Sequence, residues 1–435
     1  MTAPPEEGLR RDIGRLGFGA ININSIIGAG VFGLPAVVAA RAGDFSPWMI
    51  LLGGLMIFTV VLSFARASSM VRSTGGSIVY ASNAFGPFVG FQTGWLTYIS
   101  RAAAMAANTN LLVTYASWFW APLDVHPWRG LALTLIFGSL TWLNMSGLRH
   151  SMATVYVLTV LKLLPLSLLI LLGLGRVDLH VLFGASAPPL EGFGETLLIL
   201  LYAYVGFEGT VVNAGEGRSP RRDLPRALIN TVLLIGAIYF LVQVVSMAIM
   251  PNLASSRTAL ADAAEILLGP AGAALLTLGA VFSIGGNLSG SILSAPRMTY
   301  ALARDGSLPA WFATVHPRHL TPNNAILFYG LLSWLLALSG TFIWLAVMST
   351  LVRLLAYMVC VAALPRLARQ SEPGDPVFSL PGGMLIPILS LLLCLWLVTH
   401  AGPEAWLTAG AFAVLGTGLY LHSRRRGALP GPPVA

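Results

Sequence analysis

The chain has 435 residues, of which 56% are hydrophobic and 10% are charged, and its formal net charge is +8. A soluble domain usually has about 25% charged residues, so this composition excludes an ordinary soluble protein and predicts apolar spans of roughly 20 residues each. The basic residues stand in the loops between apolar runs, which favours a membrane explanation of the charge over binding to nucleic acid.

Twelve membrane spans are predicted from apolar length and from the charged residues, Gly and Pro that bound each run. The expected ranges are 16–40, 46–66, 86–119, 129–147, 152–175, 192–214, 225–250, 271–303, 324–339, 342–364, 382–400 and 403–422. A short external helix is predicted between spans 7 and 8, at Ala259 to Leu268. A short internal helix is predicted between spans 8 and 9, at residues 307–315.

The loop arginines are distributed unequally between the two sides of the membrane. Most of them share a side with both termini, and the opposite side holds Arg41, Arg129, Arg176 and Arg257. The positive-inside rule then places both termini in the cytoplasm. We therefore expect a multi-pass protein of the cytoplasmic (inner) membrane, with cytoplasmic segments at residues 1–15 and 423–435.

Glycines interrupt the first span in the middle of the bilayer. Gly28, Gly30 and Gly33 stand within six residues, and Pro35 follows, although each interior glycine costs a helix roughly 1 kcal/mol relative to alanine. One interpretation is an unwound stretch whose free N–H and C=O groups bind a ligand, because lipid offers them no partner and a half-helix N-terminus suits a carboxylate. The alternative is close packing between helices through small residues.

The sixth span repeats this pattern. Gly206 and Gly209 flank Glu208 within an apolar run, five spans after the first interruption. Two interrupted helices at matching positions of two halves indicate an inverted-repeat transporter, whose site lies where the two breaks face each other. The predicted units are the halves 16–175 (spans 1–5) and 192–364 (spans 6–10), followed by spans 11–12 at 382–422.

Three segments resemble the amino acid/polyamine/organocation transporter superfamily, in its amino acid permease branch. They are Gly28-Ala29-Gly30-Val31-Phe32, then Gly206-Phe207-Glu208 with Arg222-Asp223-Leu224-Pro225, and Ala303-Arg304-Asp305-Gly306 after span 8. The resemblance covers spans 1 to 10 in order. It implies an all-α integral membrane fold of twelve transmembrane helices, a leucine-transporter-like 5+5 inverted repeat with broken helices 1 and 6 plus two extra helices.

The resemblance also implies an amino acid site between the two breaks. The substrate carboxylate is expected at amides of span 1, and its ammonium group at carbonyls of the span-6 break and near Ile26. Tyr202 and Phe207 are candidates for contacting or gating the substrate. The expected substrate-binding residues are Ile26, Gly28, Ala29, Gly30, Tyr202, Tyr204, Val205 and Phe207.

Lys162, the only lysine of the chain, lies well inside span 5. A lysine at this depth is costly and indicates a functional site by default, although it could instead tether backbone carbonyls. In sodium-independent relatives similar to this chain, a lysine here stands in for a bound sodium ion near the unwound part of span 1. The resemblance therefore favours proton coupling or exchange over sodium coupling.

Three further charged residues lie inside the predicted spans. Glu208 could relay protons, or hold the bend of span 6 by accepting backbone hydrogen bonds. Arg101 in span 3 and Arg353 in span 10 depart from the family pattern. They could pair with Glu208, extend toward water along a polar path or contact an acidic substrate. The alternative is that a span boundary is misplaced and one of the two arginines lies near the membrane interface.

A second charged group follows span 6 and span 8. Glu216 and Arg222, with Arg304 and Asp305, are candidates for a cytoplasmic gate. A solvated loop that obeys the positive-inside rule is the alternative explanation of these charges.

These features predict secondary active transport of amino acids by alternating access. Neutral amino acids are the first substrate candidates. We expect transport to be independent of sodium and either coupled to protons or based on exchange. Alternatives are an exporter and an exchanger of cationic or acidic amino acids or polyamines. An intramembrane enzyme or a channel is remote, because the spans hold no pair of convergent acids or histidines and no charged ring. We expect no metal or cofactor, membrane lipid around the chain, and no obligatory heavy-chain subunit, since neither Cys360 nor Cys394 falls in an external loop.

Overall fold

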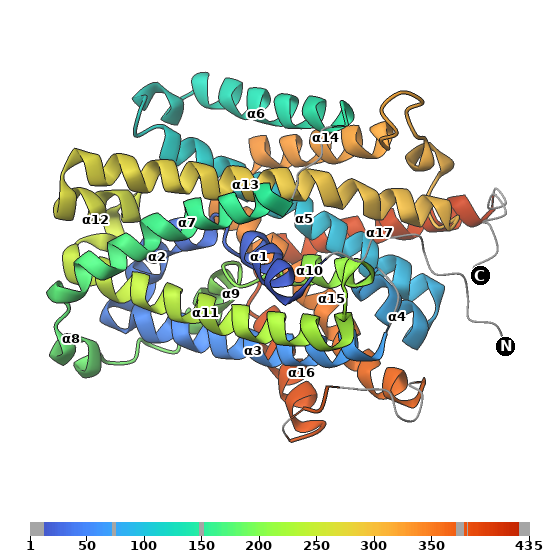
Figure 1. The fold of residues 1–435 in the computed structure, drawn as a ribbon, viewed down its shortest axis with the longest axis horizontal. Helices are drawn as coiled ribbons and strands as arrows, with labels where there is room; N and C mark the ends of the chain where they lie inside the picture. The colour runs from blue at the N-terminus through green and yellow to red at the C-terminus, as the bar shows by residue number, and fades with distance from the viewer. Residues whose placement is uncertain (1–12, 72–74, 148–151, 371–377, 381, 426–435) are drawn as a thin grey trace.

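The computed structural model describes residues 13–71, 75–147, 152–370, 378–380 and 382–425. These residues form helices and connecting loops, and no named strand occurs among them. The long helices run along the longest axis of the molecule (Figure 1). One end of that axis carries α8 (Leu179–Gly184) and α12 (Ala259–Leu268), and the other carries α4 (Ser77–Phe85). We call these the α12 end and the α4 end; the predicted orientation makes the α4 end cytoplasmic.

The first half of the chain contains one broken helix and four continuous ones. Its members are α1 (Arg15–Ile26) with α2 (Gly30–Ala42), then α3 (Ser46–Met70), α5 (Pro87–Ala116), α6 (Trp128–Met145) and α7 (Met152–Gly173). The helix α4, directly before α5, was not predicted from the sequence. Most of the predicted segment 1–15 lies outside the described residues.

The second half repeats this order. Its members are α9 (Phe193–Leu201) with α10 (Glu208–Val212), then α11 (Pro220–Ile249), α13 (Pro270–Arg304), α14 (Asn323–Ser339) and α15 (Phe342–Gln370). The broken helices α1, α9 and α10 lie in the middle of the molecule, enclosed by α3, α11, α13 and α15 (Figure 1). The predicted all-α fold with breaks in the first and sixth spans is confirmed.

Local sequence explains where several of these helices begin. Proline occupies the first turn of α3, α5, α11 and α13, at Pro47, Pro87, Pro220 and Pro270. A proline there interrupts no helical hydrogen bond, because the first amides of a helix have no partner within it. The short helix predicted between spans 7 and 8 is α12, with the predicted bounds.

Within the described part of the chain, five helical segments are long and apolar enough to cross a bilayer by themselves. They are Gly30–Met70, Met152–Arg176, Pro220–Ile249, Pro270–Arg304 and Phe342–Gln370. The two broken spans consist of shorter helices, which explains why length alone does not single them out. Twelve crossings therefore stay a prediction, as do the unit boundaries drawn from them.

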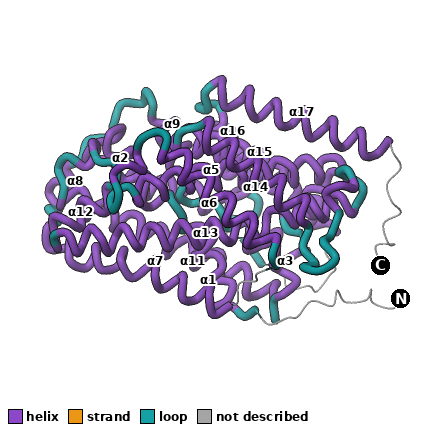
Figure 2. Tube along the Cα trace, turned by 90° about the horizontal axis from the view of Figure 1, so that it is seen from above, coloured by secondary structure: helices purple, strands orange, loops and turns teal. Residues whose placement is uncertain are grey.

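The last two helices differ from simple straight spans. α16 (Leu385–Val398) has 14 residues, which rise only about 21 Å against a hydrocarbon thickness of about 30 Å. It meets α17 (Pro403–Arg425) at an angle of 111°. In the second view α17 lies along one edge of the molecule (Figure 2). The predicted tail 423–435 lies mostly outside the described residues.

Candidate functional site

The first break separates α1 from α2 at residues 27–29. The amide of Ile27 closes the last turn of α1 on the carbonyl of Ile23, at 2.8 Å. After it, the amides of Gly28, Ala29, Gly30 and Val31 find no acceptor among the described residues. All four residues are buried. They form a helix N-terminus with unsatisfied donors and a positive dipole end, which is an arrangement that binds anions.

The second break separates α9 from α10 at residues 202–207. The amides of Tyr202, Ala203 and Tyr204 still close tight turns onto residues 199–201. Beyond them the carbonyls of Tyr204 and Val205 accept no hydrogen bond among the described residues, whereas that of Phe207 accepts from the Thr210 amide at 3.0 Å. The break therefore offers acceptors from Tyr204 and Val205, and the carbonyl of the predicted Phe207 is already used.

The two breaks touch through their backbones. A Cβ on Gly30 would lie 2.6 Å from the Cα of Ala203, so glycine is required for this approach. Gly206 has a φ of +122° and lies against the carbonyl of Ser25, so it combines a conformation that favours glycine with a close contact. The free amides of α2 and the free carbonyls of the second break therefore belong to segments in direct contact, and a shared substrate site between them stays a prediction.

Two polar side chains that sequence reasoning missed, Asn108 and Asn287, lie over Gly28 and join the predicted Tyr202 in a polar cluster. Asn108 Nδ2 donates to Asn287 Oδ1 at 2.8 Å, and Tyr202 Oη donates to Asn108 Oδ1 at 2.6 Å. Asn287 Nδ2 also donates to the carbonyls of Asn24 and Ser25, at 3.1 and 3.0 Å. A Cβ on Gly28 would lie 3.2 Å from Asn287 and 3.4 Å from Asn108. The available signal was an asparagine inside each of two apolar helices, α5 and α13.

The side chain of Lys162 joins α7 to the first break. It is 0% exposed, and its Nζ donates to the carbonyl of Ile27 at 2.8 Å. Ser283 Oγ of α13 donates to the same carbonyl at 3.3 Å. No carboxylate pairs with Lys162 in the part of the chain that the structure describes. The ammonium group therefore sits where it compensates main-chain carbonyl dipoles at the break.

Glu208 stands at the start of α10 and is held by two hydrogen-bond donors and one ion pair. Its Oε2 accepts from the Gly206 amide at 3.1 Å and from Tyr357 Oη at 2.6 Å. Its Oε1 lies 3.3 Å from Nε of Arg353, and both side chains are only 4% exposed. Of the partners considered for Arg353, the structure therefore shows Glu208. The bond to Gly206 is the contact expected of a residue that holds the bend.

Two of the predicted aromatic residues turn away from the breaks. Tyr204 donates through its hydroxyl to the carbonyl of Ile50 in α3, at 2.9 Å. The ring of Phe207 packs against Phe64 and Tyr357, with centroids 5.3 and 5.1 Å away. Tyr204 therefore offers the site its main chain, and Tyr202 is the predicted aromatic residue whose hydroxyl joins the polar cluster.

The four residues considered for a cytoplasmic gate are not joined by ion pairs among themselves in the described part of the chain. Glu216 takes part through its main chain, whose carbonyl accepts from the amide of Ile13 at 3.0 Å. Arg304 ends α13 and Asp305 follows it. A gate formed by Glu216, Arg222, Arg304 and Asp305 stays a prediction.

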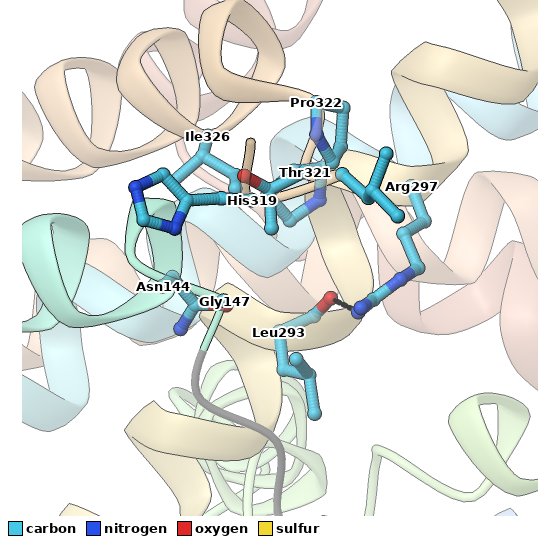
Figure 3. A pocket seen from close by; sticks show the side chains of 10 residues that line it. Asn144, Gly147, Leu293, Arg297, His319, Thr321, Pro322 and Ile326 are labelled. Atoms are coloured by element: carbon cyan, nitrogen blue, oxygen red, sulfur yellow. Dashed lines mark hydrogen bonds between the residues drawn. The ribbon is translucent and has the colours of Figure 1, made fainter. Parts of the chain in front are cut away.

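A separate small cavity lies away from the breaks, between the end of α6, the middle of α13 and the segment before α14 (Figure 3). Its volume is about 30 Å³, and Arg297, His319 and Thr321 are among its lining residues. Figure 3 shows Arg297 folded back onto the carbonyl of Leu293. None of the predicted site residues lines this cavity.

The chain is similar to known amino acid permeases. Residues 13–412 match the family model described as "Amino acid permease". The serine/threonine exchanger SteT of Bacillus subtilis (strain 168) is 29% identical, over 95% of this chain and 92% of that protein. The branched-chain amino acid permease BcaP of the same organism is 26% identical, over 98% and 95% of the two chains.

A solved structure shares the fold. MhsT, crystallised in complex with L-phenylalanine, superposes with a TM-score of 0.58 over 93% of this chain and 100% of that chain. The two sequences are 14% identical, so the likeness concerns the fold alone. The fold is the leucine-transporter-like arrangement of a 5+5 inverted repeat with two broken helices.

Proposed function

The chain belongs to the amino acid permease family, as a multi-pass membrane transporter of amino acids and not an enzyme, and from this premise we propose that it binds the substrate zwitterion between its two broken helices. The carboxylate takes the free amides of Gly28 to Val31, and the ammonium group takes the carbonyls near Ile26, Tyr204 and Val205. The observation that carries this proposal is the direct contact between the breaks, which places unsatisfied donors beside unsatisfied acceptors.

We propose that transport is independent of sodium. The Lys162 ammonium group holds the Ile27 carbonyl, a main-chain oxygen of the unwound stretch that a sodium ion would otherwise be expected to bind. Coupling is then to protons or to the exchange of one amino acid for another. Alternating access would open the site first to one end of the molecule and then to the other, across the cytoplasmic membrane with both termini inside.

Neutral amino acids are the proposed substrates. Asn108, Asn287 and Tyr202 place uncharged polar groups over Gly28, and Glu208 is committed to Arg353 and Tyr357. Among the described residues no free carboxylate therefore faces the site to receive a cationic side chain, which argues against cationic amino acids and polyamines. The names of SteT and BcaP both describe neutral amino acids. Export uses the same site in the opposite direction.

Proteoliposomes of the purified full chain test these proposals. Uptake of labelled L-serine, L-leucine, L-glutamate and L-arginine is measured in sodium-free buffer, with and without an inward proton gradient and with and without internal amino acid. Accumulation driven by the gradient identifies a symporter, and uptake only into preloaded vesicles identifies an exchanger. A strict sodium requirement contradicts the proposed role of Lys162, and uptake of L-arginine alone contradicts the proposed substrate class.

A further inference from the structure

We propose that Arg101 forms a second carboxylate-binding site, on the path between the two breaks and the α4 end, where an amino acid is held as it enters or leaves. This inference rests on the proposed function and adds a second binding site to the same transport path. It starts from the balance of charges. Glu208 is fully engaged by Arg353, Tyr357 and the Gly206 amide. Arg101 has no carboxylate within ion-pair distance among the described residues.

The partners of Arg101 are hydroxyl groups. Its Nη2 donates to Ser294 Oγ of α13, and the hydroxyl of Tyr329 lies close enough to interact with it. Tyr329 is in turn hydrogen-bonded to Ser291, at 2.7 Å. Glu208 acts on Arg101 only at longer range. A guanidinium group can donate five hydrogen bonds and fits a carboxylate in a bidentate fashion, so these neutral partners leave it able to bind an anion.

The guanidinium lies next to the broken helices. A Cβ on Gly209, in the first turn of α10, would lie 3.5 Å from Arg101 Nη1 and 3.8 Å from Ser25 Oγ near the end of α1. Along the helices it is displaced from the substrate site. Arg101 precedes Asn108 of the polar cluster by seven positions, toward the start of α5, and seven residues of helix rise about 10.5 Å.

Ser294 is displaced from Asn287 by the same seven positions, toward the end of α13. Both displacements point to the α4 end, because α13 runs there from α12 and α5 begins beside α4 (Figure 1). The pair of Arg101 and Ser294 is therefore about two helical turns from the pair of Asn108 and Asn287, on the same two helices.

The side chain of Arg101 is more exposed than those of Lys162 and Arg353, two other positively charged residues within the helices. Lys162 is 0% and Arg353 is 4% exposed, whereas Arg101 and Ser294 are half-buried. One face of α13 continues this accessible strip at helical spacing, through Gly290 and Ser294 to the exposed Arg297. In this proposal a ligand approaches the guanidinium group along this strip, from the α4 end.

A carboxylate is the ligand that this arrangement selects. It neutralises Arg101, which has no acid within ion-pair distance among the described residues, and the hydroxyl of Tyr329 lies beside the guanidinium group. Two sources carry the group: the α-carboxylate of every amino acid, and the side-chain carboxylate of an acidic one. Transport of L-serine or L-leucine compared with L-glutamate distinguishes them.

The test uses oriented proteoliposomes of the full chain and the variants Arg101→Gln, Arg101→Lys and, as a matched control, Arg424→Gln, which removes an exposed arginine at the α4 end. We expect Arg101→Gln to raise KM about tenfold or more for substrate presented at the α4 end, with KM at the α12 end unchanged. Arg101→Lys should restore part of the loss. An effect on L-glutamate alone identifies the side-chain carboxylate, and an effect on all substrates identifies the α-carboxylate. Unchanged KM at both ends, or equal increases at both, overturns the proposal.

A second measurement separates this inference from the proposed transport. The thermal unfolding midpoint of the purified protein is recorded with L-serine, L-glutamate and L-serinamide, which lacks the carboxylate. Even if no amino acid is taken up, stabilisation by a carboxylate compound that is absent with L-serinamide and reduced in Arg101→Gln supports the site. A wild-type protein that no carboxylate compound stabilises overturns it.

Discussion

The side chain of Lys162 donates a 2.8 Å hydrogen bond to the main-chain carbonyl of Ile27, the first residue of the break between α1 and α2. The lysine comes from the fifth helix of the first half and the carbonyl from the first. A buried ammonium group in the bilayer is costly, and here it meets a main-chain carbonyl that also accepts from the Ser283 hydroxyl. The break is therefore stabilised by a cation that belongs to the protein.

Replacing this cation should abolish transport. In Lys162→Met the Ile27 carbonyl keeps only Ser283, and we expect the initial rate of uptake in sodium-free proteoliposomes to fall at least about tenfold, since a hydrogen bond from a charged group is worth roughly 1.5–3 kcal/mol. Leu161→Ala is the control, because Leu161 is adjacent on α7 but 38% exposed. Equal uptake by Lys162→Met and wild type contradicts the role assigned to the lysine.

Adding a methyl group at Gly30 should separate the two breaks. The new Cβ would lie 2.6 Å from the Cα of Ala203, so one backbone must move and the donors and acceptors of the site lose their alignment. We expect Gly30→Ala to lower the thermal unfolding midpoint and to remove substrate-dependent stabilisation. Gly236→Ala in α11 meets nothing within 4 Å, and we expect it to be neutral or to stabilise by up to about 1 kcal/mol through helix propensity. Similar behaviour of the two variants counts against the contact.

Removing one charge of the buried ion pair between Arg353 and Glu208 should lower the stability of the protein more than removing both charges. Arg353→Met leaves Glu208 buried at 4% exposure without its cation, and such a loss costs about 3–5 kcal/mol. The double variant Arg353→Met/Glu208→Gln removes the uncompensated charge and should recover much of the unfolding midpoint. Additive losses in this double-mutant cycle would show that the two side chains do not depend on each other.

Two arginines that share Asp124 at the α12 end should contribute unequally to the stability of the protein. Arg129 is 28% exposed and also donates to Thr114 and to the carbonyl and side chain of Asn110, at 3.1–3.3 Å. Arg257 is 77% exposed, and its partner among the residues that the structure describes is Asp124. We expect Arg257→Ala to change stability by less than about 1 kcal/mol, and Arg129→Ala to lower the unfolding midpoint clearly more. Equal effects of the two substitutions would contradict this ranking.

The helical breaks could be predicted because they depend on the chain itself. Gly28 and Gly30, and later Gly206, weaken a helix wherever they stand in a bilayer, so their matched positions indicated both interruptions. Span limits were predictable for the same reason, since proline and glycine end or start helices locally. The prediction was weaker for α16, because neither its length of 14 residues nor its angle to α17 follows from apolar composition.

The sequence by itself therefore determined that the chain is a helical membrane protein with two interrupted helices, and that Lys162 and Glu208 are charges buried within it. Only the tertiary structure decided their partners. Arg353 meets Glu208 across 145 positions of chain, while Arg101, equally available in the sequence, meets Ser294 instead. Local backbone preferences act within a few residues and can be read from the sequence, whereas these choices depend on which faces of α5, α10, α13 and α15 pack together.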